Sequence, residues 1–122
     1  MTRINCVPVT ELNDKQLQAE YIELPRVFSM AANAERHNRL KSLPWRFCYG
    51  EGHVRFFYNK LEYCAERHVE ITKEMFRREL KVDMVAVDQP WRKHTPSFLW
   101  GNWTPSQWEI NLCKEELKKI ER

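Results

Sequence analysis

The residues that could carry chemistry begin at the start of the chain, where Met1 is followed by Thr2 and Arg3. A small second residue favours removal of the initiator methionine, which would leave the α-amine of Thr2 as the chain start. An α-amine has a pKa of about 7.7 to 8.0, so at physiological pH a sizeable neutral fraction can attack a carbonyl carbon and form an imine. Arg3 would lower the amine pKa through like charge and hold a phosphate. We take the Thr2 amine as a candidate nucleophile, although most chain termini have no such role.

A second candidate group is the carboxylate of Glu23, which precedes Arg26 by three residues. Side chains with this spacing share a face of a helix, so we expect Glu23 and Arg26 to pair. A carboxylate held by an arginine could polarise a sugar ring, accept a proton during an elimination or steer a protonated amine. An exposed pair of this kind also occurs on many helix surfaces with little energetic effect. The two residues alone leave both interpretations open.

The first predicted helix must position Glu23. Asn13 or Asp14 can cap its N-terminus, Gln16 is placed to complete a capping box, and apolar residues then recur at steps of three and four. Pro25 lies inside this pattern, where it removes an amide donor and obstructs the preceding turn. We therefore expect the helix to bend near Glu23.

Two further helices and a long loop complete the predicted fold. Apolar residues step through a second helix from Phe57 to near Lys81, after a turn marked by two glycines. Residues 82–104 are irregular and rich in tryptophan, and we assign their one β-like string, VDMVAV, to the loop. Thr104 can cap a third helix with Pro105 at its first position. The pattern predicts an all-α protein of three main helices.

Composition bounds the class of protein. With 122 residues, of which 43% are hydrophobic and 30% charged, the chain predicts a single globular domain over residues 1–122. Its three glycines form no phosphate-binding loop, and its four cysteines and four histidines form no close pairs of metal ligands, so we expect neither a nucleotide cofactor nor a metal. The sequence contains no signal peptide and no long apolar run, which predicts a cytosolic protein with free thiols and no membrane contact.

Positive charge is concentrated in residues 34–46, which hold Arg36, Arg39, Lys41 and Arg46 against a single acid. The whole chain carries a net charge of +3, a modest excess that fits binding to nucleic acid or another polyanion. Beside a pocket that contains the proposed nucleophile, these four side chains would contact phosphates. Without such a pocket they would be ordinary surface charge.

Four strings of residues carry a resemblance to a known family. The chain reads MTRIN at 1–5, TEL at 10–12, AEYIELPRVF at 19–28 and GHVRFFYNKLE at 52–62. In this order it resembles the bacteriophage endonuclease V family, the pyrimidine-dimer DNA glycosylases. The first three strings keep the family's absolute position, and the similarity is strong to about residue 80 and faint beyond it.

The resemblance implies a small all-helical monomer, with its N-terminal segment threaded between helices, that acts on double-stranded DNA carrying a damaged, modified or missing base. It implies a glycosylase coupled to β-elimination at the resulting abasic site, in the cytoplasm of a bacterial or phage-infected cell. The family's nucleophile falls on the amine of Thr2 and its essential glutamate on Glu23. The amine would displace the base from the anomeric carbon, while Glu23 would stabilise the cationic sugar and assist proton transfers. Arg3 and Arg26 match residues that line the pocket and hold DNA.

Several residues near these motifs have less settled roles. His53 and Lys60 fall inside the last string, so they are either DNA neighbours or structural residues, whereas His68 lies on an apolar stripe and is predicted to be a hydrogen-bonded core residue. Ile22 stands where the family has a second arginine, and Gln16 stands where it has a histidine. Both remain expected neighbours of the DNA.

The C-terminal part departs further from the family. The family chain ends in an aromatic and basic tail that presses on the lesion, whereas this chain ends in KKIER. A replacement wedge could come from Trp91, Lys93 and His94 or from segment 100–103, because aromatic faces stack on unpaired bases. Three tryptophans are assigned instead to the core, namely Trp45, Trp100 and Trp108. These departures leave open which base is removed, and whether the chain is instead a non-catalytic DNA-binding protein on the same scaffold.

Overall fold

Helices provide the regular structure of the described residues, 3–50 and 52–120, in the computed structural model. Within these residues no strand forms, and a single isolated bridge pairs Lys60 with Trp100. The prediction of an all-α fold is therefore confirmed. Thr2, the predicted nucleophile, lies outside the described residues. Across the described part of the chain, no helix has the length and apolar character needed to cross a membrane.

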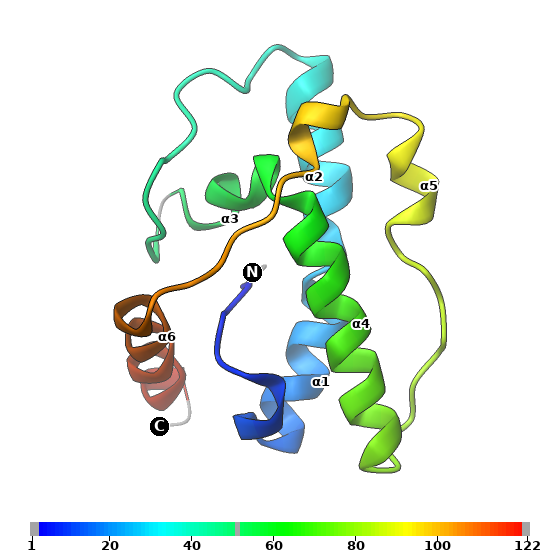
Figure 1. Cartoon of the computed structure of the whole chain (residues 1–122), viewed down its shortest axis with the longest axis vertical. Helices are drawn as coiled ribbons and strands as arrows, with labels where there is room; N and C mark the ends of the chain where they lie inside the picture. Colours follow the sequence, from blue (N-terminus) through cyan, green and yellow to red (C-terminus); the bar gives the residue numbers. More distant parts are fainter. Residues whose placement is uncertain (1–2, 51, 121–122) are drawn as a thin grey trace.

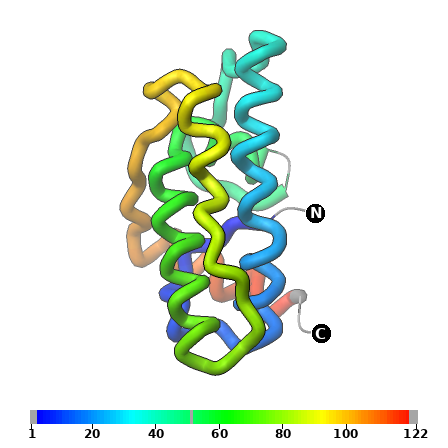
Figure 2. Tube along the Cα trace, turned by 90° about the vertical axis from the view of Figure 1, so that its right-hand side faces the viewer, coloured from blue at the N-terminus to red at the C-terminus, as the bar shows by residue number. Residues whose placement is uncertain are grey.

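Helices α1 (Asp14–Glu23) and α2 (Arg26–Arg36) follow one another along one side of the molecule (Figures 1 and 2). The predicted capping box is confirmed: Asn13 Oδ1 accepts from the Gln16 backbone N–H at 2.8 Å, and Gln16 Oε1 accepts from the Asn13 N–H at 2.9 Å. The helical run is interrupted at Leu24 and Pro25, where the proline predicted a bend. Glu23 is consequently the last residue of α1.

Three elements occupy the region of the predicted second helix, namely α3 (His53–Phe56), the 3₁₀ helix η2 (Phe57–Asn59) and α4 (Leu61–Arg77). The prediction that this helix continues to near Lys81 is wrong. Glu79 adopts a left-handed backbone conformation with φ of 62°, and the Leu80 N–H donates to the Met75 carbonyl at 2.9 Å, a pattern that ends a helix. Helix α4 packs against both α1 and α2.

The loop that follows α4 contains α5 (Gln89–Arg92) and the 3₁₀ helix η3 (Ser97–Leu99), and its VDMVAV string is irregular as assigned. Helix α6 (Gln107–Ile120) closes the chain. The predicted start at Thr104 is wrong, because Ser106 forms the cap. Ser106 Oγ accepts from the Glu109 N–H at 3.3 Å, and Glu109 Oε1 accepts from the Ser106 N–H at 2.8 Å.

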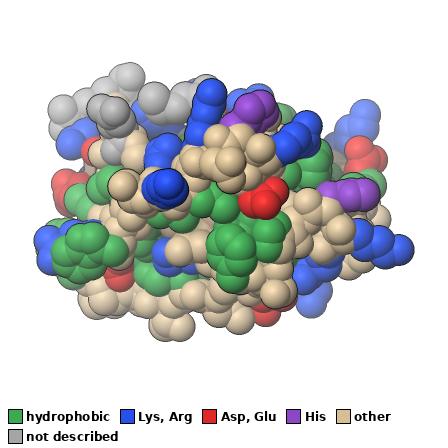
Figure 3. Space-filling view, turned by 90° about the horizontal axis from the view of Figure 1, so that it is seen from above, with side chains coloured by type: hydrophobic (Ala, Val, Ile, Leu, Met, Phe, Trp, Pro, Cys, Tyr) green, Lys and Arg blue, Asp and Glu red, His purple; other side chains and the backbone are tan. Residues whose placement is uncertain are grey.

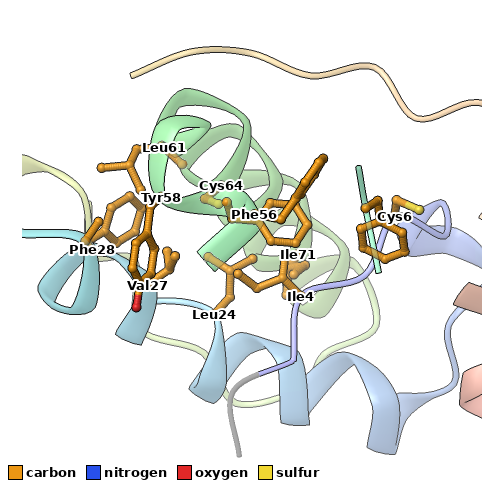
Figure 4. Packing of buried hydrophobic residues seen from close by; sticks show 14 of the residues in the cluster. Ile4, Cys6, Leu24, Val27, Phe28, Phe56, Tyr58, Leu61, Cys64 and Ile71 are labelled. Carbon is orange, nitrogen blue, oxygen red and sulfur yellow. The ribbon is translucent and has the colours of Figure 1, made fainter. Parts of the chain in front are cut away.

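The N-terminal segment runs through the interior between α6 and the α1–α4 pair (Figure 1). Ile4 and Cys6 are buried, and Ile4 lies beside Leu24 and Ile71 in the core (Figure 4). Cys6 Sγ lies 2.9 Å from Cys113 Sγ on α6, and both thiols are buried and free. These contacts hold residues 4–6 between the helices, as the family resemblance implied.

Three tryptophans pack against the core. Trp100 stacks on Phe28 with 5.7 Å between ring centroids, and Trp103 stacks on Phe47 at 5.5 Å. Trp91 also lies partly buried against the core. The assignment of Trp100 to the core is confirmed, and segment 100–103 supplies packing instead of the exposed wedge that the sequence allowed.

Two tryptophans are exposed, so their assignment to the core is wrong. Trp45 is 82% exposed and Trp108 is 60% exposed. Helix α6 turns the face that carries Ile110 and Cys113 toward the protein, and Trp108 falls on the opposite face because of the 3.6-residue period. Trp45 lies in the irregular connection between α2 and α3, which buries the neighbouring Phe47 instead.

Candidate active site

The backbone next to Thr2 is held by the predicted catalytic acid. The N–H of Arg3 donates to Glu23 Oε1 at 3.1 Å across a partly buried contact. Glu23 stands at the end of α1, immediately before the break at Leu24, so its side chain reaches the N-terminal segment from the helix terminus. The structure therefore brings the described neighbour of Thr2 together with Glu23, two groups that are distant in sequence.

His53 holds the next residue of the same segment. Its Nε2 accepts from the Ile4 N–H at 3.0 Å, and its Nδ1 lies 2.8 Å from the Cys48 carbonyl. Since an amide can only donate and a carbonyl can only accept, the ring is neutral and carries its proton on Nδ1. Burial lowers the pKa of His53, and the nearby Arg3 charge lowers it further, which keeps this tautomer neutral. His53 is therefore an interior support for the backbone and not an exposed DNA contact.

A buried ion pair fixes Asn5. Arg67 on α4 donates to both oxygens of Glu20 on α1, at 2.6 and 3.0 Å. Asn5 Nδ2 donates to Glu20 Oε1 at 2.9 Å, and Asn5 Oδ1 accepts from Arg67 Nη2 at 2.8 Å. Burial lowers the pKa of Arg67, but Glu20 raises it more, so the net shift is upward and the guanidinium stays charged. The three side chains hold the N-terminal segment against α1 and α4.

Sequence reasoning missed this network. Asn5 and Glu20 both lie inside the strings that carry the family resemblance, and that position was the available signal for them. Arg67 gave no signal, because an arginine among the charged residues of α4 has the pattern of an exposed helix face. Tyr63, whose hydroxyl donates to the Asn5 carbonyl at 3.1 Å, was also missed.

The surroundings of Glu23 differ from the prediction in one respect. In the described part of the chain no ion pair joins Glu23 and Arg26, which is exposed at the start of α2. The break at Leu24 and Pro25 places Arg26 in a separate helix, and Glu23 accepts from the Arg3 backbone instead. Ile22, beside the acid, is 64% exposed.

A comparison with protein families identifies the scaffold. A family model described as pyrimidine dimer DNA glycosylase matches residues 1–88. The chain belongs to this family. Membership confirms the resemblance read from the sequence. The family acts on DNA that contains pyrimidine dimers, which supports a DNA glycosylase function in general and DNA as the partner. The match includes α1 to α4, which carry Glu23, His53 and Arg67, and ends before α5 and α6.

Gln16 and Lys60, which were also predicted to contact DNA, have structural roles. Gln16 belongs to the capping box at the opposite end of α1 from Glu23, about 10 Å away along the helix. Lys60 donates from Nζ to the Phe56 carbonyl at 3.1 Å and to Asn59 Oδ1 at 2.9 Å, and burial lowers its pKa. Neither residue is directed toward Glu23 by these contacts.

The basic stretch is exposed where α2 ends. Arg36, Arg39, Lys41 and Arg46 all have exposed side chains. Arg55 Nη2 donates to the carbonyls of Arg39 and Lys41, at 3.5 and 3.3 Å, which ties this loop to α3. Figure 3 looks down on this end of the molecule, and lysine and arginine side chains are spread over it. Such a surface suits the phosphates of the DNA that the family binds.

Within residues 3–50 and 52–120, no group of three or more His, Cys, Asp and Glu side chains is arranged to hold a metal ion. The groups that contact the backbone of residues 3 and 4 are instead the Glu23 carboxylate, which suits proton transfer, and the neutral His53 imidazole, which has a structural role.

Proposed function

We propose that the protein is a bifunctional DNA glycosylase and abasic-site lyase whose nucleophile is the Thr2 α-amine, freed by removal of Met1. The hydrogen bond from the Arg3 N–H to Glu23 Oε1, 3.1 Å long, supports this proposal most strongly. Covalent geometry keeps the α-nitrogen of any residue within about 4 Å of the next backbone nitrogen. An amine at Thr2 would therefore be at most about 7 Å from Glu23 Oε1, a separation across which the carboxylate can act directly or through one water.

The proposed reaction has two stages. The neutral amine bonds to C1′ of the damaged nucleotide while the glycosidic bond breaks, and the base leaves with that electron pair and takes up a proton. As the ring C1′–O4′ bond opens, the nitrogen gives up one proton and O4′ takes one up, which leaves a protonated imine and a free hydroxyl. Loss of a proton from C2′ and departure of the 3′ phosphate break the strand, and hydrolysis of the imine frees the amine. Glu23 would stabilise the cationic sugar and carry these protons.

The supports of the N-terminal segment favour catalysis because they fix the approach of the amine. Glu23, His53 and the Glu20–Arg67 pair hold Arg3, Ile4 and Asn5 respectively. These three consecutive residues fix the backbone to which Thr2 is attached, and a nucleophile presented from a fixed position reacts faster than a mobile one.

Exposed Ile22 favours a second candidate function. A cation beside Glu23 would attract the phosphates of the lesion, and this chain has an apolar side chain there that is 64% exposed. A protein on this scaffold that binds damaged DNA without cutting it is the alternative. Incubation with duplexes that each carry one pyrimidine dimer, one modified base or one abasic site separates the two functions and identifies the target.

The test compares wild type with Glu23→Gln and with Glu66→Gln, a matched change of an exposed acid on α4. We expect wild type and Glu66→Gln to cut one of the damaged duplexes, and Glu23→Gln to bind it without cutting. Full activity of Glu23→Gln would remove Glu23 from the mechanism. Tight binding by wild type with no cutting of any duplex would favour the non-catalytic alternative.

A further inference from the structure

The two exposed tryptophans lie at one surface hollow. Trp45, from the connection between α2 and α3, and Trp108, from the first turn of α6, line a hollow of about 330 Å³ together with Arg46 and Glu109. Residues far apart in the sequence thus contribute two flat aromatic side chains and a cation to the same place. A volume of this size is within the range of small-molecule sites.

The exposure of both rings calls for a function. Trp91, Trp100 and Trp103 pack against the core, whereas Trp45 and Trp108 leave 82% and 60% of their surface in solvent. Exposed aromatic surface is costly in water and commonly marks a binding site. A hollow bounded by indole rings suits a flat, polarisable ligand.

Charge indicates which flat ligand fits. The Arg46 guanidinium lies 4.9 Å from the centroid of the Trp45 ring, and Arg46 ends the exposed basic stretch that holds Arg39 and Lys41. These cations favour a polyanion at the edge of the hollow. Glu109 is held by its bond from the Ser106 N–H, and its carboxylate repels phosphate but accepts from the amino groups of bases. The base of a nucleotide therefore suits the hollow, with its phosphates toward the cations.

We propose that Trp45, Arg46 and Trp108 form a stacking site for one unpaired nucleobase of the damaged duplex. This inference rests on the proposed function, because an unpaired base is present where a lesion is opened or a base has been removed. Each base has a face that stacks on an aromatic ring, and an arginine above a tryptophan extends the stack. The site would hold damaged DNA more tightly than intact duplex, in which the bases are already paired.

The test measures the dissociation constant for a duplex that carries one tetrahydrofuran, a stable abasic analogue, and for the same duplex without it. Stacking is worth about 1–3 kcal/mol per base, so the double variant Trp45→Ala/Trp108→Ala should bind the damaged duplex about 5- to 150-fold more weakly. Its affinity for the intact duplex should stay near that of wild type, because phosphate contacts are retained. The conservative double variant Trp45→Phe/Trp108→Phe should recover part of the loss.

Phe98→Ala serves as the control, because Phe98 is 66% exposed and lies outside the hollow. An equal affinity of the Trp45→Ala/Trp108→Ala variant and wild type for the damaged duplex would overturn the proposal, as would an equal loss on both duplexes. A dimeric wild-type protein together with a monomeric Trp45→Ala/Trp108→Ala variant would also overturn the proposal, because a second copy of the chain would then fill the hollow. Abasic-site cutting by wild type is measured in parallel: a selective loss of binding without any cutting supports the stacking site while the lyase proposal fails.

Discussion

Replacement of Arg67 by methionine is predicted to weaken both the fold and the site. The side chains of Arg67 and Glu20 are 5% and 2% exposed, and Arg67→Met removes both bonds to Glu20 and one to Asn5 while leaving the carboxylate buried. Removal of one partner from such a pair typically costs about 3–5 kcal/mol of unfolding free energy. For a chain of 122 residues this loss lowers the melting temperature by about 12–20 °C.

Thermal unfolding followed by circular dichroism measures the effect. Arg77→Met is the matched control, because Arg77 also pairs with a glutamate of α4 but has an exposed side chain, and we expect it to melt close to wild type. The double variant Glu20→Gln/Arg67→Met should melt above Arg67→Met, since it removes the stranded charge. At a temperature where each protein is folded, Arg67→Met should also cut abasic DNA more slowly, because Asn5 loses its support. A melting temperature of Arg67→Met within a few degrees of wild type would refute the reasoning.

Three further predictions concern separate features. Acidification from about pH 7.5 to 5 should lower the denaturant concentration at the midpoint of unfolding. Burial lowers the pKa of both His53 and His68 in the folded protein. The unfolded chain therefore takes up protons near pH 6.5 that the folded chain does not, and the folded state loses stability. The decline should be shallower in His53→Asn, and an unchanged profile would contradict the neutral tautomer. Ser106→Ala should lower the free energy of unfolding, measured by chemical denaturation, by about 1 kcal/mol, and Thr104→Ala should leave it unchanged. A larger loss for Thr104→Ala than for Ser106→Ala would assign the α6 cap to Thr104. Ile22→Arg should steepen the salt dependence of DNA binding by roughly one released counterion, and an equal slope would show that residue 22 does not face DNA.

The features that could be predicted from the sequence depend on neighbouring residues. Asn13 and Gln16 form their capping box within one turn, and Pro25 interrupts the helix where its ring must. His68 lies on the apolar stripe of α4 and is buried, with Nε2 3.2 Å from the Tyr21 carbonyl, as expected. The same local logic misplaced the start of α6, because Thr104 followed by proline is also a good cap and competed with the Ser106–Glu109 pair.

The supports of the candidate site could not be predicted, because their partners are distant in the chain. Arg67 and Glu20 are 47 residues apart, and His53 and Ile4 are 49 apart. Amphipathic patterning tells which face of a helix is buried but not which charged residue will find an opposite charge inside the protein. The exposure of Trp45 and Trp108 was missed for a related reason: tryptophan is usually mostly buried, and nothing local distinguishes a ring kept in solvent for a ligand.

Trapping of the imine tests the central claim most directly. Borohydride added while the protein acts on abasic DNA reduces an imine to a stable amine, and peptide mass spectrometry then locates the bound sugar. We predict an adduct on the N-terminal peptide at the α-nitrogen of Thr2, with Met1 absent, and no adduct when Met1 is retained. An adduct on a lysine, or none on protein whose intact mass shows that Met1 has been removed, would contradict the account.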